Sequence, residues 1–285
     1  MPLCFQPHWL DSCAHEWDVL YSNIDGYSAF WVYHLERKLT FTFIRNPHLT
    51  PYTGLFFCEE NIKKDMKSKL VEDLMSQIPK ADVIELDLSL YIDIDLKFKQ
   101  YQVSNKRTNL LNLLDRDHLY SNFKPALKRQ IKKAERSLTI YESDDIEKFY
   151  ELHKKTFIKQ NQEAKIPLSV YKSYWECTKQ NKCGQLFFIE DEDKNQHASL
   201  WLAYDENTAY YLAGGTDAKF YGSGAMSQLM WHAIQVSINL GKKTFDFEGS
   251  MLPNIDRFFK NFSPIEQNYL HIEKVNSMIY KLLKK

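Results

Sequence analysis

The segment Lys219-Phe220-Tyr221-Gly222-Ser223-Gly224-Ala225 (KFYGSGA) decides the fold of this chain. It follows an apolar strand expected over Ala209–Ala213 and precedes an apolar helix expected over Ser223–Leu240, which Gly241 would end. Glycines before a helix let backbone N–H groups turn towards an anion, and the helix N-terminus adds partial positive charge. The pattern predicts a pyrophosphate site. A tight turn that needs small residues is the alternative.

A second polar segment lies where the following strand, expected over Thr244–Phe247, ends: Phe245-Asp246-Phe247-Glu248-Gly249-Ser250. Ligands of open α/β sheets bind beyond the carboxyl ends of strands, so Glu248 and Ser250 are candidate catalytic residues. We predict that Glu248 is the base that removes a proton from an acceptor ammonium. The alternative is a strand-end carboxylate that caps the next helix or pairs with Arg257.

The segments around these motifs have the periodicities of an α/β domain. The upstream runs predict two helices and three strands: Asp144–Lys159 with Ser143 or Asp144 as its N-cap, Leu168–Lys179, Gln185–Glu190, Ala198–Tyr204 and Ala209–Ala213. A short helix over Asn254–Asn261, a strand over Asn268–Glu273 and a helical tail are expected downstream. The second half therefore combines helices with a mixed sheet.

The first half repeats this order of elements without obvious sequence identity. Its expected strands are 18–24, 28–35, 39–44, 82–88 and about 99–104, and its expected helices are 8–15, 60–78 and 119–137. A Pro- and Gly-broken loop at Asn46–Gly54 stands where the second half has its glycine loop. We predict an α/β fold with mixed (α+β) sheets in two tandem halves, residues 1–140 and 141–285, joined by a short strand or linker at Ser137–Ser143.

The composition is that of a globular protein with balanced charge. The 285 residues are 44% hydrophobic and include 37 Lys+Arg and 37 Asp+Glu, so the net charge gives no reason to expect a strongly anionic partner. Five cysteines, an odd number without a Cys-x-x-Cys pair, argue against a disulfide framework or a thiolate zinc site. We recognise no signal peptide and no bilayer-spanning run, and expect a cytoplasmic protein without membrane insertion or a metal.

The strand, Gly214-Gly215, the glycine loop, the helix and the stretch Arg257–Phe262 (RFFKNF) together resemble the core of GNAT acyltransferases. In that superfamily a loop of pattern Arg/Gln-x-x-Gly-x-Gly/Ala holds the pyrophosphate of acyl-CoA. The residues at the matching positions are Lys219, Gly222 and Gly224. Phe259 stands where many members carry a Tyr as general acid.

The resemblance implies roles for two groups of backbone atoms. Those that would cradle the pyrophosphate belong to Ser223, Gly224 and Ala225. Those that would donate hydrogen bonds to the oxyanion of the reacting thioester belong to Leu212, Ala213 and Gly214. Because residues 46–54 lack this glycine pattern, we expect the first half not to hold the donor. Tyr52 and Thr53 are polar candidates for lining an acceptor cleft, and a turn without a ligand is the alternative.

The tandem arrangement is similar to the Fem-type branch, whose members add amino acids to peptidoglycan precursors from aminoacyl-tRNA. The basic segment Lys124–Arg136 (KPALKRQIKKAER) resembles the basic helix between the halves of such proteins. It could meet RNA phosphates, with Lys128 and Arg129 as the residues to test by charge reversal, or it could be a solvated helix face.

Three functions follow as hypotheses. The first is transfer of an acyl group from acyl-CoA, of which acetyl-CoA is one candidate, to a small-molecule or peptide amine. The second is Fem-like aminoacyl transfer from aminoacyl-tRNA to a peptidoglycan-type precursor. The third is a non-catalytic GNAT-like module that binds a metabolite or a partner, which Phe259 would favour.

Overall fold

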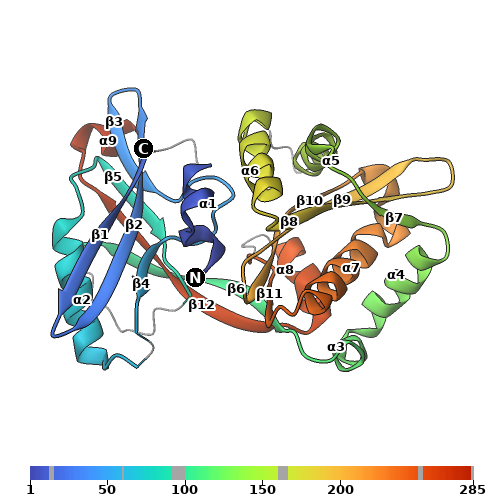
Figure 1. Cartoon of the computed structure of the whole chain (residues 1–285). Coiled ribbons are helices and arrows are strands. Elements are labelled where there is room, and N and C mark those ends of the chain that lie inside the picture. The colour runs from blue at the N-terminus through green and yellow to red at the C-terminus, as the bar shows by residue number, and fades with distance from the viewer. Residues whose placement is uncertain (13–15, 60, 91–99, 160–165, 250–252, 284–285) are drawn as a thin grey trace. The chain divides into compact units, whose positions relative to one another are not determined.

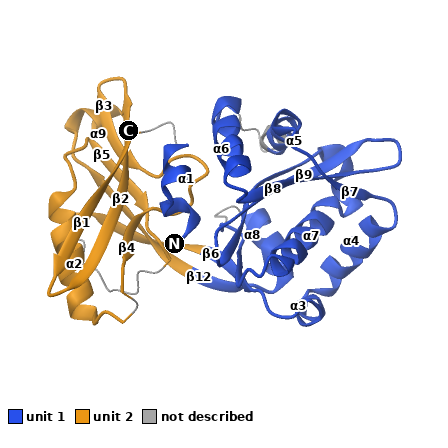
Figure 2. Ribbon diagram, in the orientation of Figure 1, with its two compact units in different colours: residues 1–12, 108–267 blue, residues 13–107, 268–285 orange. Residues whose placement is uncertain are grey.

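The computed structural model describes residues 1–12, 16–59, 61–90, 100–159, 166–249 and 253–283. This part of the chain divides into two compact units (Figure 1, Figure 2). Unit 1 contains Met1–Ser12 and Thr108–Gln267, and unit 2 contains Cys13–Arg107 and Asn268–Lys285. Each unit is therefore assembled from two separate stretches of the chain.

The sheet of unit 1 has the strand order β6-β11-β10-β9-β8-β7. Its strands are β6 (Gln102–Asn112), which enters this unit at Thr108, and β7 (Thr139–Glu142), β8 (Gly184–Glu190), β9 (Gln196–Tyr204), β10 (Thr208–Thr216) and β11 (Thr244–Asp246). Strands β7 to β10 form an antiparallel meander, β10 and β11 are parallel, and β11 and β6 are antiparallel. Helix α7 (Ala225–Asn239) connects the parallel pair.

Helices cover both faces of this sheet (Figure 1). Those that pack on its strands include α5 (Ile146–Lys159), α6 (Leu168–Gln180) and α7. The unit also contains α1 (Pro7–Asp11), α3 (Arg116–Asn122), α4 (Pro125–Glu135) and α8 (Pro253–Phe259), with 3-10 turns η1 (Leu3–Phe5), η2 (Ala218–Ser223) and η3 (Lys260–Phe262). On β9, Leu200 and Leu202 face the core under α7, whereas Trp201 contacts Phe149 of α5 and Trp175 of α6. The two-residue period of a strand thus places alternate apolar side chains under opposite layers.

Unit 2 has the strand order β1-β2-β3-β5-β12, and β4 pairs with β2. Its elements are β1 (Glu16–Ile24), β2 (Tyr27–Lys38), β3 (Phe41–Arg45), β4 (Gly54–Phe57), α2 (Lys64–Gln77), β5 (Val83–Asp87), β12 (Ile265–Val275) and α9 (Met278–Leu283). Strands β1 to β3 are antiparallel, β3 and β5 are parallel, and β5 and β12 are antiparallel. Leu70, Val71 and Leu74 of α2 are buried in the core of this unit.

The two units share one topology, so the predicted tandem fold is confirmed at this level. Each has an antiparallel meander, a helix, a parallel strand and a further antiparallel strand. The last strands are exchanged: the neighbour of β11 is β6 and not β12, which follows it in the chain, and the neighbour of β5 is β12 and not β6. Compact units therefore do not follow the predicted boundary at residue 140.

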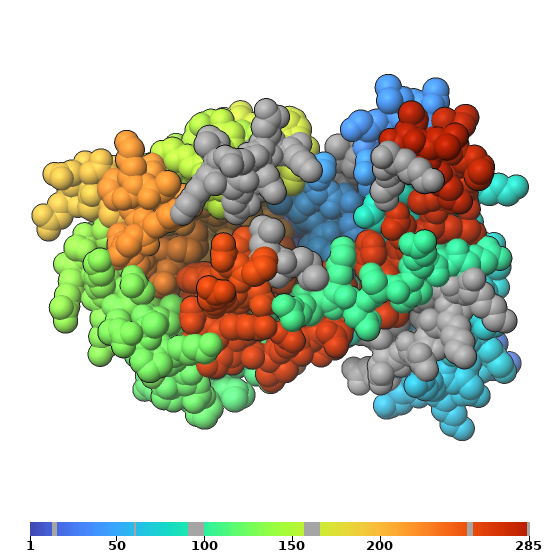
Figure 3. Space-filling model, turned by 180° about the vertical axis from the view of Figure 1, so that it is seen from behind, coloured from blue at the N-terminus to red at the C-terminus, as the bar shows by residue number. Residues whose placement is uncertain are grey.

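The core of unit 1 explains where residues 108–140 belong. Leu119, Phe123, Leu127 and Ile131 are buried in one cluster with apolar residues of α7 and β9. On the back of this unit, the light-green residues of α3 and α4 lie beside the orange-red residues of α8 and η3 (Figure 3), where Lys124 N donates to Asn261 O. This burial, rather than sequence proximity, assigns the segment to unit 1.

Three local expectations need correction. The helix expected over 119–137 is two helices, because Pro125 lacks an N–H and holds the preceding Lys124 in an extended conformation. The N-cap of α5 is Asp145, whose Oδ1 accepts from Lys148 N at 2.9 Å. The end of the loop expected at 46–54 leads into a strand, β4, that sequence reasoning did not predict.

None of the helices in the described part of the chain is long and apolar enough to cross a membrane.

Candidate active site

Among the described residues, the second half of β10 has no neighbouring strand on one of its two sides. Thr208–Tyr210 of β10 pair with Thr244–Asp246, but β10 continues to Thr216 after β11 has ended. On the β9 side, a bulge between Tyr211 and Ala213 leaves Leu212 without a register partner. Within the described residues, this second half of β10 has no strand on its β11 side. Its backbone groups on that side can therefore pair with a ligand.

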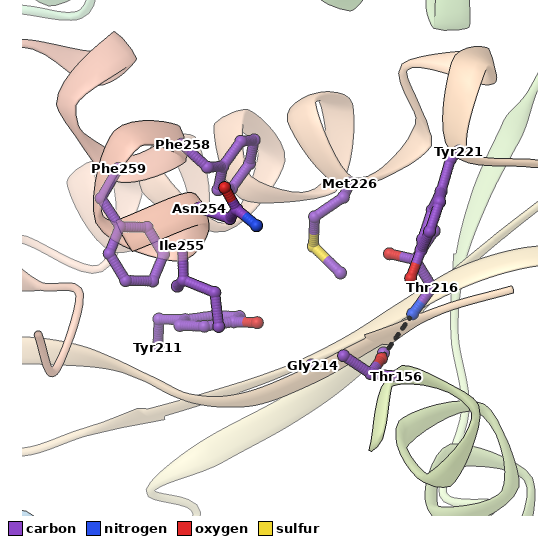
Figure 4. Close-up of a pocket in the computed structure, with 11 residues that line it drawn as sticks. Thr156, Tyr211, Gly214, Thr216, Tyr221, Met226, Asn254, Ile255, Phe258 and Phe259 are labelled. Carbon is purple, nitrogen blue, oxygen red and sulfur yellow. Dashed lines mark hydrogen bonds between the residues drawn. The ribbon is translucent and has the colours of Figure 1, made fainter. Parts of the chain in front are cut away.

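A pocket of about 510 Å³ lies along this half of β10 (Figure 4). Its walls come from β10, α5, η2, the first turn of α7 and α8, and are formed by Thr156, Tyr211, Gly214, Gly215, Thr216, Tyr221, Met226, Asn254, Ile255, Phe258 and Phe259. The lining is mostly apolar and aromatic, with a few polar groups, which is the usual composition of a small-molecule site.

The glycine loop that leads into α7 is held by its conformation and by α4. Gly224 is the N-cap of α7 and has φ +84°, and a Cβ there would lie 2.3 Å from the backbone oxygen of Gln130. Only glycine meets both requirements. Gly222 has open space around it, because a Cβ at that position would meet no atom within 4 Å. The two glycines of the motif therefore have different reasons to be there.

The basic helix α4 supports this loop directly. Lys133 Nζ donates to Gly222 O at 2.7 Å, and Lys128 Nζ donates to Ser121 O. Leu127, Ile131 and Ala134 form the buried stripe of the helix. Some cations of the segment thus have structural partners, so the segment is more than a solvated face.

Glycines on β10 allow α5 to approach the strand closely. A Cβ on Gly215 would lie 2.5 Å from the backbone of Leu152 and His153. The His153 ring then reaches Gly214 O, with Nδ1 2.7 Å from that oxygen. Burial lowers the pKa of His153, so the ring is neutral at neutral pH and its Nδ1–H donates to this carbonyl. The contact fixes the Gly214–Gly215 peptide at the edge of the pocket.

Glu248 follows β11 in a strained, left-handed conformation with φ +54°. Its backbone N–H donates to Asp246 Oδ1 at 2.8 Å, and Thr108 Oγ1 donates to the same oxygen at 2.6 Å. Glu248 Oε1 is buried and has no hydrogen-bond partner among the described residues. Burial, and then the charge of Asp246, raise the pKa of Glu248 well above its usual value.

Comparisons with known proteins agree with this geometry. A family model described as an acetyltransferase (GNAT) domain matches residues 121–260. The crystal structure of FemX has a TM-score of 0.74 and 14% identity, and the match covers 99% of this chain and 94% of that one. Residues 121–260 thus form a GNAT domain, and the chain as a whole has the tandem fold of FemX. At the level of the family, a GNAT domain indicates a transferase of acyl groups.

Other solved structures share the tandem GNAT fold more distantly. The C-terminal domain of a putative lysylphosphatidylglycerol synthetase from Agrobacterium fabrum has a TM-score of 0.56 and 14% identity, and the match covers 97% of this chain and 89% of that one. A tandem GNAT protein from the clavulanic acid biosynthesis pathway has a TM-score of 0.53 and 8% identity, with 93% and 84% covered. No curated protein matches the chain.

The GNAT domain contains a pocket residue that sequence reasoning missed, Tyr211. Its ring lines the pocket and contacts the edge of Phe259, with ring centroids 5.7 Å apart. A Cβ on Gly214 would lie 2.4 Å from the Tyr211 hydroxyl oxygen, so this hydroxyl lies against the Gly214 backbone. Burial, and then the charge of Glu248, raise the pKa of Tyr211. The bulge that turns Tyr211 into the pocket has no signature in the sequence.

The predicted site residues of the GNAT domain are only partly gathered at this pocket. Gly214 lines it, Leu212 and Ala213 precede it on β10 as buried residues, and Ser223, Gly224 and Ala225 lead from η2 into α7. Lys219 is exposed on η2, and neither Lys219 nor Glu248 lines the pocket. No ion pair joins Glu248 to Arg257 within the described residues, and Ser250 lies outside them.

In the described residues of unit 2, the corresponding place is filled by the chain itself. After β3 ends at Arg45, the Asn46 side chain donates to Asp87 O and accepts from Asp87 N, and Thr53 forms a parallel bridge with Leu88. Residues 46–53 thus occupy the β3 side of the strand end of β5. Thr53 is fully buried and its hydroxyl donates to Val32 O. This corrects the expectation that Thr53 lines an acceptor cleft.

No group of three or more His, Cys, Asp or Glu side chains in the described part of the chain is arranged to hold a metal ion.

Proposed function

We propose that this protein transfers an acyl group from acyl-CoA to an amine. One observation carries the proposal: the strand side of β10 beyond Tyr210 is open to a pocket in unit 1, whereas residues 46–53 fill the equivalent place in unit 2. An extended thioester arm can pair with the uncovered backbone of β10, as an added strand would. This contrast also supports unit 1 as the donor-binding unit.

The donor's charged end fits the start of α7. Gly224 in its left-handed conformation and the first turn of a 15-residue helix present backbone N–H groups to an anion. Lys219 is exposed on the preceding turn and supplies a positive charge. We assign the pyrophosphate to Ser223, Gly224 and Ala225, and the thioester to the pocket beside Gly214.

The reaction then needs an oxyanion site and a base. Backbone N–H groups of Leu212, Ala213 and Gly214 are assigned to the oxyanion, because they precede the peptide that His153 fixes. Glu248 is assigned as the base for the acceptor nitrogen. Since Glu248 does not line the pocket, it takes the proton through one bridging water. Its raised pKa makes Glu248 a stronger base than an ordinary carboxylate.

Thermal unfolding with and without acyl-CoA tests donor binding at the loop. Saturating acetyl-CoA or a longer acyl-CoA, at about 100 times its Kd, is expected to raise the Tm of the wild-type protein by roughly 5–10 °C. Gly222→Asp is expected to lose most of this shift, because it adds a negative charge beside the pyrophosphate in open space without a clash. Asn has nearly the same shape as Asp but no charge, so Gly222→Asn is expected to keep the shift in Tm.

The outcomes separate the three hypotheses. No shift with any acyl-CoA would remove acyl-CoA as the donor. An equal loss in the Asp and Asn variants would show that shape, and not charge, matters at position 222. A shift without thiol release in the presence of primary amines would favour a non-catalytic binding module.

A second candidate is aminoacyl transfer from aminoacyl-tRNA. It is favoured by the exposed cations of α4 and its C-cap. Arg129, Lys132 and Arg136 make no ion pair within the described residues. The TM-score of 0.74 with FemX is in keeping with it. Lys128, by contrast, is already bound to Ser121 O, so it is a poorer choice for charge reversal than the sequence suggested.

Charge reversal on α4 tests this second candidate. Arg129→Glu with Arg136→Glu is expected to lower the salt dependence of binding to mixed aminoacyl-tRNAs by about one phosphate contact per residue. Lys179→Glu changes an exposed cation of α6, on the other face of the sheet, and serves as the control. Wild-type protein that binds no tRNA at low salt would exclude this donor.

A further inference from the structure

The pocket contains a phenol that the assignments above leave unused. Tyr211 and Tyr221 are the tyrosines that line it in the described part of the chain. The Tyr211 hydroxyl makes no hydrogen bond to any described residue, although its ring is packed between β10 and α8. A hydroxyl that is free at the wall of a mostly apolar pocket is available to a ligand atom.

The position of this hydroxyl is set by the strand beneath it. Figure 4 shows the Tyr211 ring lying below Ile255 of α8, with its oxygen directed into the pocket. The oxygen lies against the Gly214 backbone, 2.4 Å from where a Cβ on Gly214 would be. Gly214 is the residue whose backbone we assign to the thioester carbonyl. The phenol and the reacting carbon would therefore be neighbours.

The surroundings keep this phenol protonated. Burial raises the pKa of Tyr211, and the charge of Glu248 raises it further. At neutral pH the residue therefore carries its proton and can donate it. Phe259, which faces Tyr211 across 5.7 Å from α8, has no proton to give.

We propose that Tyr211 is the proton donor that allows CoA to leave as a thiol, an assignment that rests on the proposed acyl transfer. Attack of the amine forms the C–N bond, and collapse of the tetrahedral intermediate breaks the C–S bond and leaves the electron pair on sulfur. The Tyr211 hydroxyl gives its proton to that sulfur. The proton released by the acceptor nitrogen to Glu248 restores the phenol, so the amine loses one proton and the thiol gains one.

Tyr211→Phe removes the hydroxyl and keeps the ring that packs on Phe259. With acetyl-CoA and a mixture of n-propylamine, spermidine and a glycine-terminated peptide, the kcat of this variant is expected to be about 100-fold or more below that of the wild type. Its acetyl-CoA thermal shift is expected to match that of the wild type. Tyr204→Phe removes a phenol at the end of β9 that does not line the pocket, and this control variant is expected to keep its rate within about threefold.

A change of leaving group separates proton donation from a merely structural role. The acetyl thioester of 4-nitrothiophenol releases a weakly basic thiolate that needs no proton. With this donor Tyr211→Phe is expected to lose less than about tenfold in kcat/KM. Equal losses with both donors, or a loss below about threefold with acetyl-CoA, would overturn the assignment of Tyr211 as the proton donor and leave the proposed acyl transfer standing. Wild-type protein that transfers acetyl from neither donor would overturn the proposed function together with it.

Discussion

Glu248→Gln is expected to lower the rate of acyl transfer by about 100-fold or more and, in the same protein, to raise the stability at neutral and alkaline pH. The rate falls because an amide cannot accept the acceptor's proton. Stability rises because Glu248 Oε1 is buried without a hydrogen-bond partner among the described residues, and a carboxylate there is poorly solvated. Active-site residues often trade stability for function in this way.

The pH dependence of this gain has a definite sign. Burial, and then Asp246, raise the pKa of Glu248 in the folded protein. The protonated carboxyl thus favours folding fully below the unfolded pKa of about 4.3, and this contribution is lost as the pH rises through the folded-state pKa. Gln has no charge to bury, so the variant should melt higher than the wild type at pH 8 and about equally near pH 4.

Thermal unfolding between about pH 4 and pH 9, together with kcat, measures both effects. Glu206→Gln removes the same charge from the exposed turn before β10 and is expected to leave rate and Tm unchanged. A Glu248→Gln variant with wild-type turnover would remove Glu248 as the base. A variant that melts lower than the wild type at pH 8 would contradict the buried, unpartnered carboxylate.

Gly224→Ala is expected to destabilise the protein by about 3 kcal/mol and to abolish acyl-CoA binding. Two costs add: a non-glycine residue with φ +84° costs about 1–2 kcal/mol, and overpacking costs about 1–3 kcal/mol. The second cost arises because the new Cβ would lie 2.3 Å from Gln130 O, a backbone atom that cannot rotate away. Helix α4 would have to move from α7, and the loop that Lys133 holds would move with it.

Urea unfolding monitored by fluorescence measures this loss, and Gly222→Ala is its matched control. A Cβ on Gly222 meets no atom within 4 Å, so this neighbouring substitution is expected to change the free energy of unfolding by less than about 0.5 kcal/mol. Equal effects at the two positions would contradict the packing of α4 against the loop. A stable Gly224→Ala protein that still binds acyl-CoA would contradict the role of the left-handed turn.

Local patterns in the sequence predicted most elements and part of the site. Gly224 could be singled out because a glycine directly before an apolar helix has few other uses, and the structure shows its left-handed conformation. Pro125 was a break that the periodicity of Phe123, Leu127 and Ile131 concealed, since all three are buried in one core although they lie on different segments. A hydrophobic stripe reports burial and not whether the helix is continuous.

In the candidate site, too, the sequence indicates candidate residues but not their surroundings. Glu248 was chosen from its place after a strand, but its isolation from hydrogen-bond partners depends on what packs around it. Tyr211 reads in the sequence as one more aromatic residue of a strand. Only the bulge before Ala213 and the end of β11 at Asp246 expose it to the pocket.

Local sequence patterns were enough to predict most of the helices and strands, the two similar halves and the need for glycine at position 224, because these depend on residues close together in the chain. The tertiary structure alone decided that β6 pairs with β11 and β12 with β5, that residues 46–53 fill one strand gap while the other opens into a pocket, and that Tyr211 and Glu248 are electrostatically coupled. Periodicity and turn residues state how each segment is buried. They do not predict which distant segment covers it, because the covering segment depends on the packing of the whole unit.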